Sequence, residues 1–202
     1  MDVTVSNIEH AVVSLIAGRA GEARAALQAI DYAGLVGLRE ATYARVRERC
    51  SAQPPYQSPL PRTARQGTKS ADVRATFTRD HYTCRYAHCR HPTVALEVLK
   101  LVSAAFPELV PYHPNWRPVD RHILYWTYST SLEHAVSFPA GGTSSPDNLL
   151  TACYLCNDAK KHLPAELLGW TVSAPGESDW LGLTEYLAEL QRVVRDLRRP
   201  PK

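Results

Sequence analysis

The sequence predicts an α+β protein, in which a small unit of strands and one helix holds a metal site between a helical N-terminal region and a C-terminal helix. Three observations predict this fold class. Apolar residues recur at helical spacing through much of residues 7–50. Residues 132–138 alternate well enough for a strand, and the Gly141-Gly142 pair after them suits a turn. Four of the five cysteines form two close pairs, Cys84 with Cys89 and Cys153 with Cys156.

The composition is that of a chain large enough to bury a core. Its 202 residues are 45% hydrophobic and 21% charged, and 23 Lys and Arg against 20 Asp and Glu give a net charge of +3. This mildly basic balance permits nucleic-acid binding without requiring it. The longest apolar stretch, near residues 11–18, is interrupted by Ser14 and falls short of the roughly 20 residues that cross a bilayer. We therefore expect no membrane segment.

The N-terminus predicts a cytoplasmic location. It begins Met-Asp, without the basic segment or the small-residue cleavage site of a secretory signal. In a reducing cytoplasm, paired cysteines are typical of metal ligands rather than of disulfides.

The N-terminal part divides into a helical region, residues 1–50, and a linker, residues 51–71. The helical region predicts a small bundle that packs on the main domain or on a partner. Four prolines exclude regular helix and sheet from the linker, and its Arg and Lys residues have no nearby acid. Such a basic segment is either a solvated tether or a contact to a phosphate backbone. The prolines are Pro54, Pro55, Pro59 and Pro61.

The remaining chain is predicted as a domain over residues 72–170, with an insert at about 92–131, and a C-terminal helical tail over residues 171–202. A helix is expected over residues 93–106, and the aromatic stretch after it shows no clear period, so we expect it to pack a local core. A short helix is expected after Pro164, and a final helix from about 184 to 198.

The segment from 132 to 162 combines several short patterns in a fixed order. In chain order these are Glu133-His134, Gly141-Gly142, Asn148-Leu149, Cys153-x-x-Cys156-Asn157 and Lys160-Lys161. This order and spacing resemble the HNH endonuclease family in its zinc-stapled form. The resemblance covers about residues 76–170, and it implies a ββα-metal core of two antiparallel strands, a loop and one helix.

The resemblance also implies roles for single residues. Phosphodiester hydrolysis needs a base for water, a cation for the leaving oxygen and donors for the phosphate oxygens. His134 is the implied base, and Asn148 is implied to orient it. Glu133 and Asn157 offer oxygen ligands that suit a catalytic Mg²⁺ or Mn²⁺ ion. Lys160 or Lys161 is expected to meet the phosphate; we predict Asn157, Lys160 and Lys161 to share a helix face.

The cysteines suit a structural zinc ion. Tetrahedral Cys₄ zinc is common, and Cys153-x-x-Cys156 has the usual spacing. The first pair departs from the family's Cys-x-x-Cys, because Ala87 stands at the expected position. We predict Cys84, Cys89, Cys153 and Cys156 as ligands, with His88 and His91 as alternatives to Cys89.

These features predict a metal-dependent HNH endonuclease that hydrolyses DNA, as an effector of a phage-defence or restriction system. Double-stranded DNA is the expected substrate, with single-stranded DNA and RNA left open. The N-terminal helices are expected to support a homodimer or to bind a partner protein. The alternative is a zinc-stapled nucleic-acid-binding module without catalysis, which keeps the fold and lacks the catalytic metal.

Overall fold

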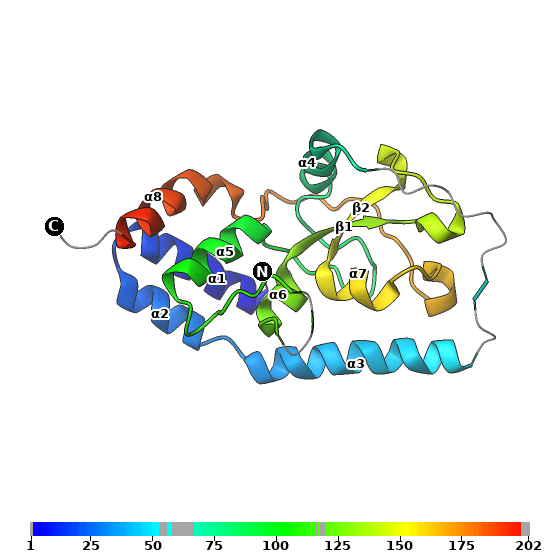
Figure 1. The fold of residues 1–202 in the computed structure, drawn as a ribbon, viewed down its shortest axis with the longest axis horizontal. Coiled ribbons are helices and arrows are strands. Elements are labelled where there is room, and N and C mark those ends of the chain that lie inside the picture. Colours follow the sequence, from blue (N-terminus) through cyan, green and yellow to red (C-terminus); the bar gives the residue numbers. More distant parts are fainter. Residues whose placement is uncertain (1, 53–55, 58–66, 116, 118–119, 199–202) are drawn as a thin grey trace.

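The structure is a computed structural model that describes the chain except residues 1, 53–55, 58–66, 116, 118–119 and 199–202. In that part of the chain it has eight α-helices and one two-stranded antiparallel sheet, which confirms a mixed α and β protein (Figure 1). No helix among the described residues combines the length and the apolar character needed to cross a membrane.

One end of the molecule is a helical bundle, which we call the helical half. It consists of α1 (Val3–Ile16), α2 (Ala20–Gln28), α5 (Leu96–Ala105), α6 (Ile123–Tyr128) and α8 (Leu187–Leu197). These helices share one apolar core, to which Ile8, Leu27, Leu99, Trp126 and Leu190 each contribute a side chain that is almost wholly buried.

The helix α1 begins at Val3, four residues before the start expected from periodicity, because Asp2 caps it. The Asp2 carboxylate accepts hydrogen bonds from the backbone amides of Thr4 (2.9 Å) and Val5 (3.2 Å), two of the donors that a helix start leaves unpaired. The same carboxylate accepts a hydrogen bond from the Tyr128 hydroxyl. The N-terminal residues are thus fixed against α6.

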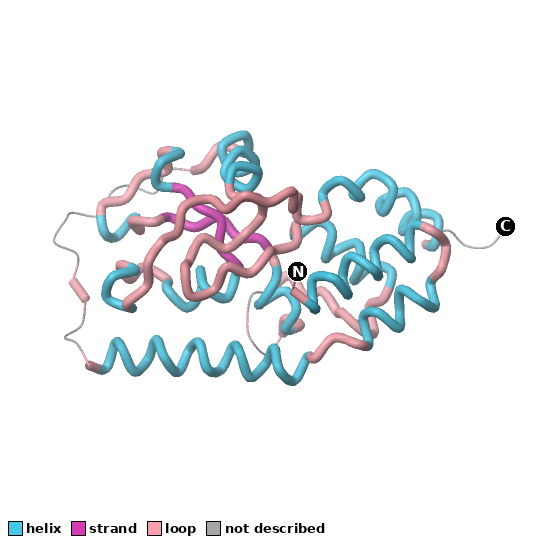
Figure 2. The backbone as a smooth tube through the Cα atoms, turned by 180° about the vertical axis from the view of Figure 1, so that it is seen from behind, coloured by secondary structure: helices cyan, strands magenta, loops and turns pink. Residues whose placement is uncertain are grey.

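The other end, which we call the hairpin half, contains the sheet. It consists of α4 (Ser70–Arg79), β1 (Thr130–His134), β2 (Leu149–Cys153) and α7 (Tyr154–Lys160), with the short 3₁₀ turns η1 (Phe138–Ala140), η2 (Pro146–Asn148) and η3 (Ala165–Leu168). The strands pair with Thr130 opposite Cys153 and His134 opposite Leu149, and α7 packs against both. Seen from behind, loops cover the strands (Figure 2).

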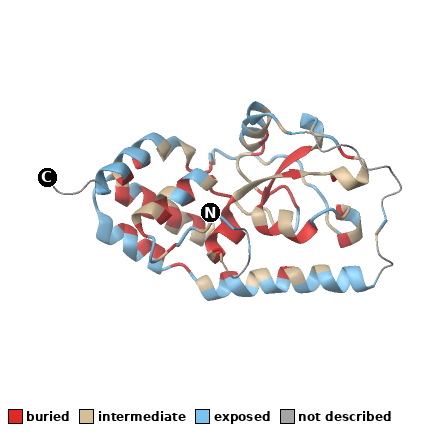
Figure 3. Ribbon diagram, viewed as in Figure 1, coloured by how far each residue is buried: buried red, intermediate tan, exposed pale blue. Residues whose placement is uncertain are grey.

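The helix α3 (Tyr32–Ser51) connects the two halves. It runs along the lower edge of the molecule in Figure 1, and most of its surface is exposed in Figure 3. Leu35 near its start belongs to the core of the helical half, whereas Leu38 packs against the hairpin half. Further along, the Tyr43 hydroxyl donates a hydrogen bond to the Asp158 carboxylate on α7.

A buried ion cluster joins α4 to the sheet. The Asp80 carboxylate, fully buried, accepts hydrogen bonds from Arg79 (2.8 Å), from Arg85 (2.5 Å) and from the backbone amide of Thr151 on β2 (2.8 Å). Arg79 also donates to the carbonyl oxygen of Leu149 at 2.7 Å. Burial raises the pKa of Asp80, but these donors outweigh it and hold the pKa below its ordinary value.

Several predicted boundaries are corrected. The strand expected over residues 132–138 ends at His134, because the next residues turn away into the loop. The helix expected over residues 93–106 is α5 and begins only at Leu96. The aromatic stretch contains α6, which periodicity missed because all of its residues are buried and no polar face marks it.

The insert predicted at about 92–131 contacts both halves: its Trp126 ring packs on Tyr154 of α7, and its last residues begin β1. Its helices α5 and α6 belong to the core of the helical half, together with α1, α2 and the C-terminal α8. The final helix is confirmed as η4 (Thr184–Tyr186) followed by α8, and the short helix after Pro164 as η3. Most of the predicted linker, with its four prolines, lies outside the described residues.

Candidate metal centre and hairpin site

The four predicted cysteine ligands come together in the hairpin half. Their sulfur atoms all lie within 4.8 Å of one another, and the Sγ atoms of Cys89 and Cys153 are 3.7 Å apart. Four sulfurs at about 2.3 Å from a tetrahedral zinc ion are about 3.8 Å apart from one another. The cluster therefore has the size of a site for a structural metal such as zinc, with Cys84, Cys89, Cys153 and Cys156 as ligands.

Two local structures carry these sulfurs. Cys84 and Cys89 lie on a tight hairpin that begins at the bridge between Thr83 and Pro92, and we call residues 83–92 the cysteine loop. Cys153 ends β2 and caps α7, since its Sγ accepts a hydrogen bond from the backbone amide of Cys156 at 3.4 Å. The cysteine loop is joined to β2 where the backbone amide of Arg85 donates to the carbonyl oxygen of Thr151 (2.9 Å). A metal here ties this loop to the sheet and to α7.

The structure favours Cys89 over the two histidines as the fourth ligand. His91 Nδ1 lies 3.2 Å from the Asp2 carboxylate and so interacts with the N-terminus. His88 Nε2 lies 3.6 Å from the Cys156 sulfur, but its ring lies against Trp170, with 4.3 Å between ring centroids. Both histidines therefore border the sulfur cluster from outside.

The close packing of the sulfurs shifts the pKa values of Cys89 and Cys153 in opposite directions. The pKa of Cys89 is lowered because the sulfurs of Cys153, Cys156 and Cys84 hydrogen-bond to it. The pKa of Cys153 is raised well above its ordinary value, because its hydrogen bonds to the other sulfurs favour the thiol and burial adds to them. A bound divalent cation removes this conflict, since metal-bound thiols are deprotonated.

Glu133 and Lys160 form a buried ion pair between β1 and α7. The two side chains are 3% and 0% exposed, and Lys160 Nζ lies 2.9 Å from Glu133 Oε1. Lys160 also donates to the carbonyl oxygen of His134 at 3.2 Å. This burial corrects the expectation that Lys160 meets a phosphate, because its ammonium group is turned into the protein.

The second oxygen of Glu133, Oε2, is buried and has no hydrogen-bond partner in the described part of the chain. Asn157 lies on the same helix as Lys160, and its Nδ2 donates to Ser131 Oγ (2.6 Å) and to the carbonyl oxygen of Leu132 (2.9 Å). The Asn157 amide is thereby fixed against β1, and its Oδ1 is left as an acceptor. An unpaired carboxylate oxygen and an amide oxygen are ligand types that suit Mg²⁺.

His134 is the last residue of β1 and is half-buried. Its Nε2 lies 3.4 Å from Ser144 Oγ, and its ring packs against Phe138 with 4.6 Å between centroids. The loop that follows folds back over the strand end, so that both contacts come from the loop. The histidine is thus held at the end of the strand, and its carbonyl oxygen accepts from Lys160 of α7.

The side chain of Asn148 hydrogen-bonds to the backbone of the loop that follows β1. Its Oδ1 accepts from the amide of Val136 (2.8 Å), and its Nδ2 donates to the carbonyl oxygens of Val136 (2.9 Å) and Thr143 (2.7 Å). Gly142 is required beside it, because a Cβ there would lie 1.7 Å from the Val136 carbonyl oxygen. Asn148 therefore fixes the loop that contacts His134.

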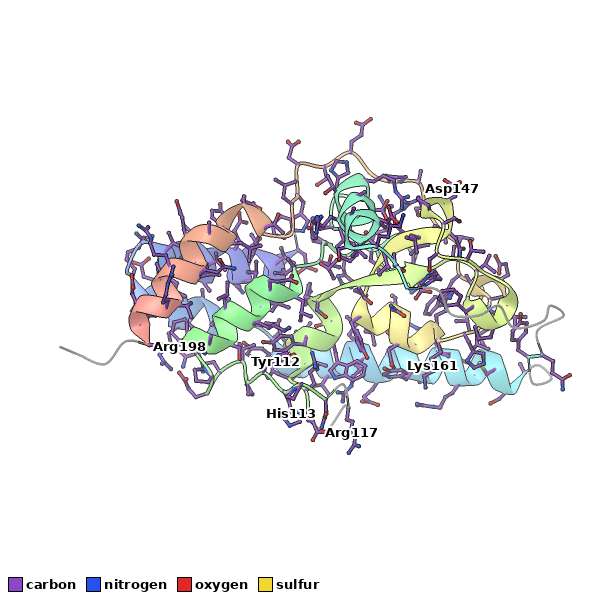
Figure 4. All side chains as sticks on the ribbon, turned by 45° about the horizontal axis from the view of Figure 1, so that its top comes forward. Tyr112, His113, Arg117, Asp147, Lys161 and Arg198 are labelled. Carbon is purple, nitrogen blue, oxygen red and sulfur yellow. The ribbon has the colours of Figure 1, made fainter. Side chains whose placement is uncertain are left out.

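Lys161 ends α7, is exposed and has a positive φ of 54°. It does not share the inward face of Asn157 and Lys160, which corrects the predicted common face. Figure 4 shows Lys161 at the end of α7, on the side of α3. An exposed ammonium group at this position is available to a ligand in solvent.

Sequence reasoning missed the Asp80 ion cluster and the Glu133–Lys160 pair. An Arg-Asp step at the end of a helix is common on protein surfaces, so the sequence carries no signal that Asp80 is buried. Tyr86, also missed, has a buried hydroxyl with no partner among the described residues, and burial together with the nearby Glu133 charge raises its pKa.

No family model matches this chain, and no curated protein or solved structure is detectably similar to it.

Proposed function

We propose that the protein is a metal-dependent endonuclease of the HNH type, with a structural zinc ion on the four cysteines. The observation that supports this most strongly is the position of His134. It ends β1 beside a loop fixed by Asn148, while Glu133 and Asn157 lie between the same strand and α7. A hairpin followed directly by a helix, with a base and oxygen ligands at their junction, suits phosphodiester hydrolysis.

Each residue has a definite part in this proposal. His134 takes the proton of the attacking water through its imidazole, which is half-buried and near the solvent boundary. Asn148 keeps the loop against His134, and exposed Lys161 meets the phosphate. Glu133 Oε2 and Asn157 would hold Mg²⁺ or Mn²⁺, which when bound stabilises the leaving oxygen. Lys160 balances the buried charge of Glu133.

The test is cleavage of supercoiled plasmid DNA by the zinc-loaded protein with Mg²⁺ or Mn²⁺. We expect nicking by the wild type and at least a thousandfold loss in His134→Ala. His10→Ala is the matched control, since His10 is an exposed histidine on α1, and it should cut at the wild-type rate. Equal activity of all three proteins would show that His134 is not the base.

A second candidate is a zinc-stapled nucleic-acid-binding module without catalysis. One observation favours it: Glu133 is buried and already paired with Lys160, so its charge is balanced without a second cation. This candidate predicts that the wild type binds DNA with a salt-dependent affinity but cuts nothing at any concentration of Mg²⁺ or Mn²⁺.

A further inference from the structure

A basic cleft of about 410 Å³ lies where the end of α3 meets η3, away from the residues of the proposed active site. One wall is the last part of α3, with Arg45, Glu48 and Arg49. The facing wall is formed by Leu168 of η3 and by Trp170. The wall on α3 belongs to the N-terminal region, which the sequence linked only to a partner or to packing.

The arginines of this cleft are available to a ligand. Arg45 and Arg49 are one helical turn apart on the exposed side of α3, and neither forms an ion pair among the described residues. Among the described residues, Arg45 makes only a long contact of 3.5 Å to Thr42 Oγ1. Glu48 is the acidic residue of the lining, so two guanidinium groups and one carboxylate give the cleft a net positive charge. The cleft therefore favours an anion.

The backbone at the end of η3 leaves space for the guanidinium group of Arg49. Gly169 has a φ of +68°, a left-handed conformation that ends the 3₁₀ turn. A Cβ at this glycine would lie 3.4 Å from Arg49 Nη2, so the guanidinium rests close to the bare backbone. The Arg49 guanidinium thus lies beside the end of η3, in the lining of the cleft.

An aromatic ring completes the cleft. Trp170 is half-buried, and its ring lies 5.1 Å from Tyr86 and 4.3 Å from His88, between centroids. Both neighbours belong to the cysteine loop, and His88 touches the sulfur of Cys156. The Trp170 ring is therefore fixed by the cysteine loop. Its accessible part offers a rigid apolar surface to a planar group.

The turn after α7 contacts the loop that follows His134 and leads into η3, which lines the cleft. The Ser137 hydroxyl, in the loop after His134, donates to the carbonyl oxygen of His162 at 2.8 Å. Lys161 and His162 are exposed in this turn, and η3 follows it directly. Figure 4 shows Lys161 at the end of α7, where this turn begins.

We infer that this cleft binds a nucleotide of a single-stranded segment that flanks the cleaved phosphodiester; its placement relative to His134 depends on the proposed function. Arg45 and Arg49 bind the phosphate, and the base stacks on Trp170. Single strands are recognised by this combination of a cationic groove and an aromatic side chain. Within a duplex the base faces are already stacked on one another, so Trp170 selects an unpaired base.

The inference is tested by binding, in the zinc-loaded His134→Ala background and without Mg²⁺, so that cleavage plays no part. The probes are a fluorescein-labelled twelve-nucleotide oligothymidylate and a labelled duplex of the same length, read by fluorescence anisotropy. Arg45→Gln with Arg49→Gln should weaken single-strand binding about tenfold. The slope of log Kd against log salt concentration should fall by about 0.7, since the two arginines contact one phosphate and each lost phosphate contact contributes about 0.7.

The matched control is Arg47→Gln with Arg192→Gln, two exposed arginines outside the cleft, on α3 and α8, that form no ion pair among the described residues. It should weaken binding less than threefold and leave the salt slope unchanged. Trp170→Leu should weaken single-strand binding about tenfold, and Trp170→Phe should restore most of it, because the aromatic face returns. Thermal melts and zinc content show that each variant is folded.

Equal effects of the two arginine pairs, or duplex binding as tight as single-strand binding, would overturn the inference. Its failure is separable from that of the proposed function. A protein that cuts plasmid while both arginine pairs behave alike is a nuclease without this cleft site. A protein that binds single strands through the cleft and never cuts keeps the cleft site and is no nuclease.

Discussion

The helical half and the hairpin half bury different kinds of side chain. In the helical half the core consists of aliphatic and aromatic residues from α1, α2, α5, α6 and α8. In the hairpin half, three of the eight residues in the buried cluster are cysteines, and the charged side chains of Asp80, Glu133 and Lys160 are buried beside it. Apolar burial stabilises in proportion to area, whereas buried charges are favourable only while their partners stay in place.

This difference has a consequence for stability. The helical half has enough apolar surface to fold on hydrophobic burial, as bundles of this kind do. The hairpin half has two short strands, the helices α4 and α7 of ten and seven residues, and a small core. A sheet of two strands is marginal by itself. We therefore expect the proposed zinc ion and the Asp80 cluster to hold the part of the molecule that carries His134.

The largest expected effect is that of metal removal. A structural zinc ion contributes on the order of 10 kcal/mol to the folding of a small domain. Chelation, or Cys153→Ser, should unfold the hairpin half while the helical half keeps its structure. Hydrogen exchange measures this directly: amides of β1, β2 and α7 should lose protection, and those of α1 and α5 should retain it.

Cys50→Ser is the control for this experiment, because Cys50 is exposed and lies outside the cluster. It should leave zinc content and exchange unchanged. An unaltered melt after verified loss of zinc would contradict a structural role for the four cysteines.

The next largest effect is expected from Asp80→Asn. It leaves Arg85 without its buried carboxylate partner, and breaking such a pair costs about 3–5 kcal/mol. The lowered pKa of Asp80 means that this stabilisation is complete above its unfolded value, about 3.9, and is lost as pH falls through the lower folded value. Urea unfolding at pH 7 measures the loss. Asp179→Asn, an exposed acid between η3 and η4, is the control and should have no effect.

A truncation in the helical half should have a similar but separable effect. Leu99 is fully buried on α5, and Leu→Ala at such a position costs about 2–5 kcal/mol. The variant should melt at a lower temperature and still bind one zinc ion per chain. Loss of zinc together with the helical core would show that the two halves fold as one unit.

The same contrast explains what could be predicted from the sequence. The helices of the N-terminal region have one apolar face each, so spacing predicted α1 and α2. The cysteine ligands were predicted because thiolate pairs have a characteristic spacing along the chain. The role of Glu133 was predicted from a sequence motif, and that motif does not indicate whether the side chain is buried.

What could not be predicted depends on contacts between distant segments. Lys160 and Lys161 are adjacent in sequence, yet one is fully buried and the other exposed, because α7 ends between them. Asp80 is buried because Arg85 and Thr151 reach it from two other segments. The cleft at Trp170 combines residues more than 100 positions apart, so no local pattern marks it.

The smallest expected effect is the pH dependence that comes from Glu133. Burial raises the pKa of its carboxyl to about 7, and the opposing effect of Lys160 is too small to restore the ordinary value of 4.5. Between pH 4.5 and about pH 7, the folded chain keeps a proton on Glu133 that the unfolded chain releases. The contribution of Glu133 to the free energy of unfolding is therefore most favourable below pH 4.5 and is lost as pH rises through 7. This change is about 3 kcal/mol at most.

Glu133→Gln mimics the protonated state and should remove this dependence. Urea unfolding in zinc without Mg²⁺ should give equal stabilities for variant and wild type near pH 5, and a more stable variant at pH 8. The contributions of the other titrating groups cancel when the stability of the wild type is subtracted from that of the variant. Glu166 is an exposed glutamate on η3, and the control Glu166→Gln should show the pH dependence of the wild type. Parallel curves for Glu133→Gln and wild type would contradict the raised pKa.

Adding Mg²⁺ to this experiment distinguishes the two candidate functions. An ion on Glu133 Oε2 favours the carboxylate, so it lowers the pKa and moves the loss of stability out of the neutral range. The wild type should then become more stable at pH 8 when Mg²⁺ is added, and Glu133→Gln should not respond. If the protein is a binding module, Glu133 serves only to pair with Lys160. Mg²⁺ should then change the stability of neither the wild type nor Glu133→Gln.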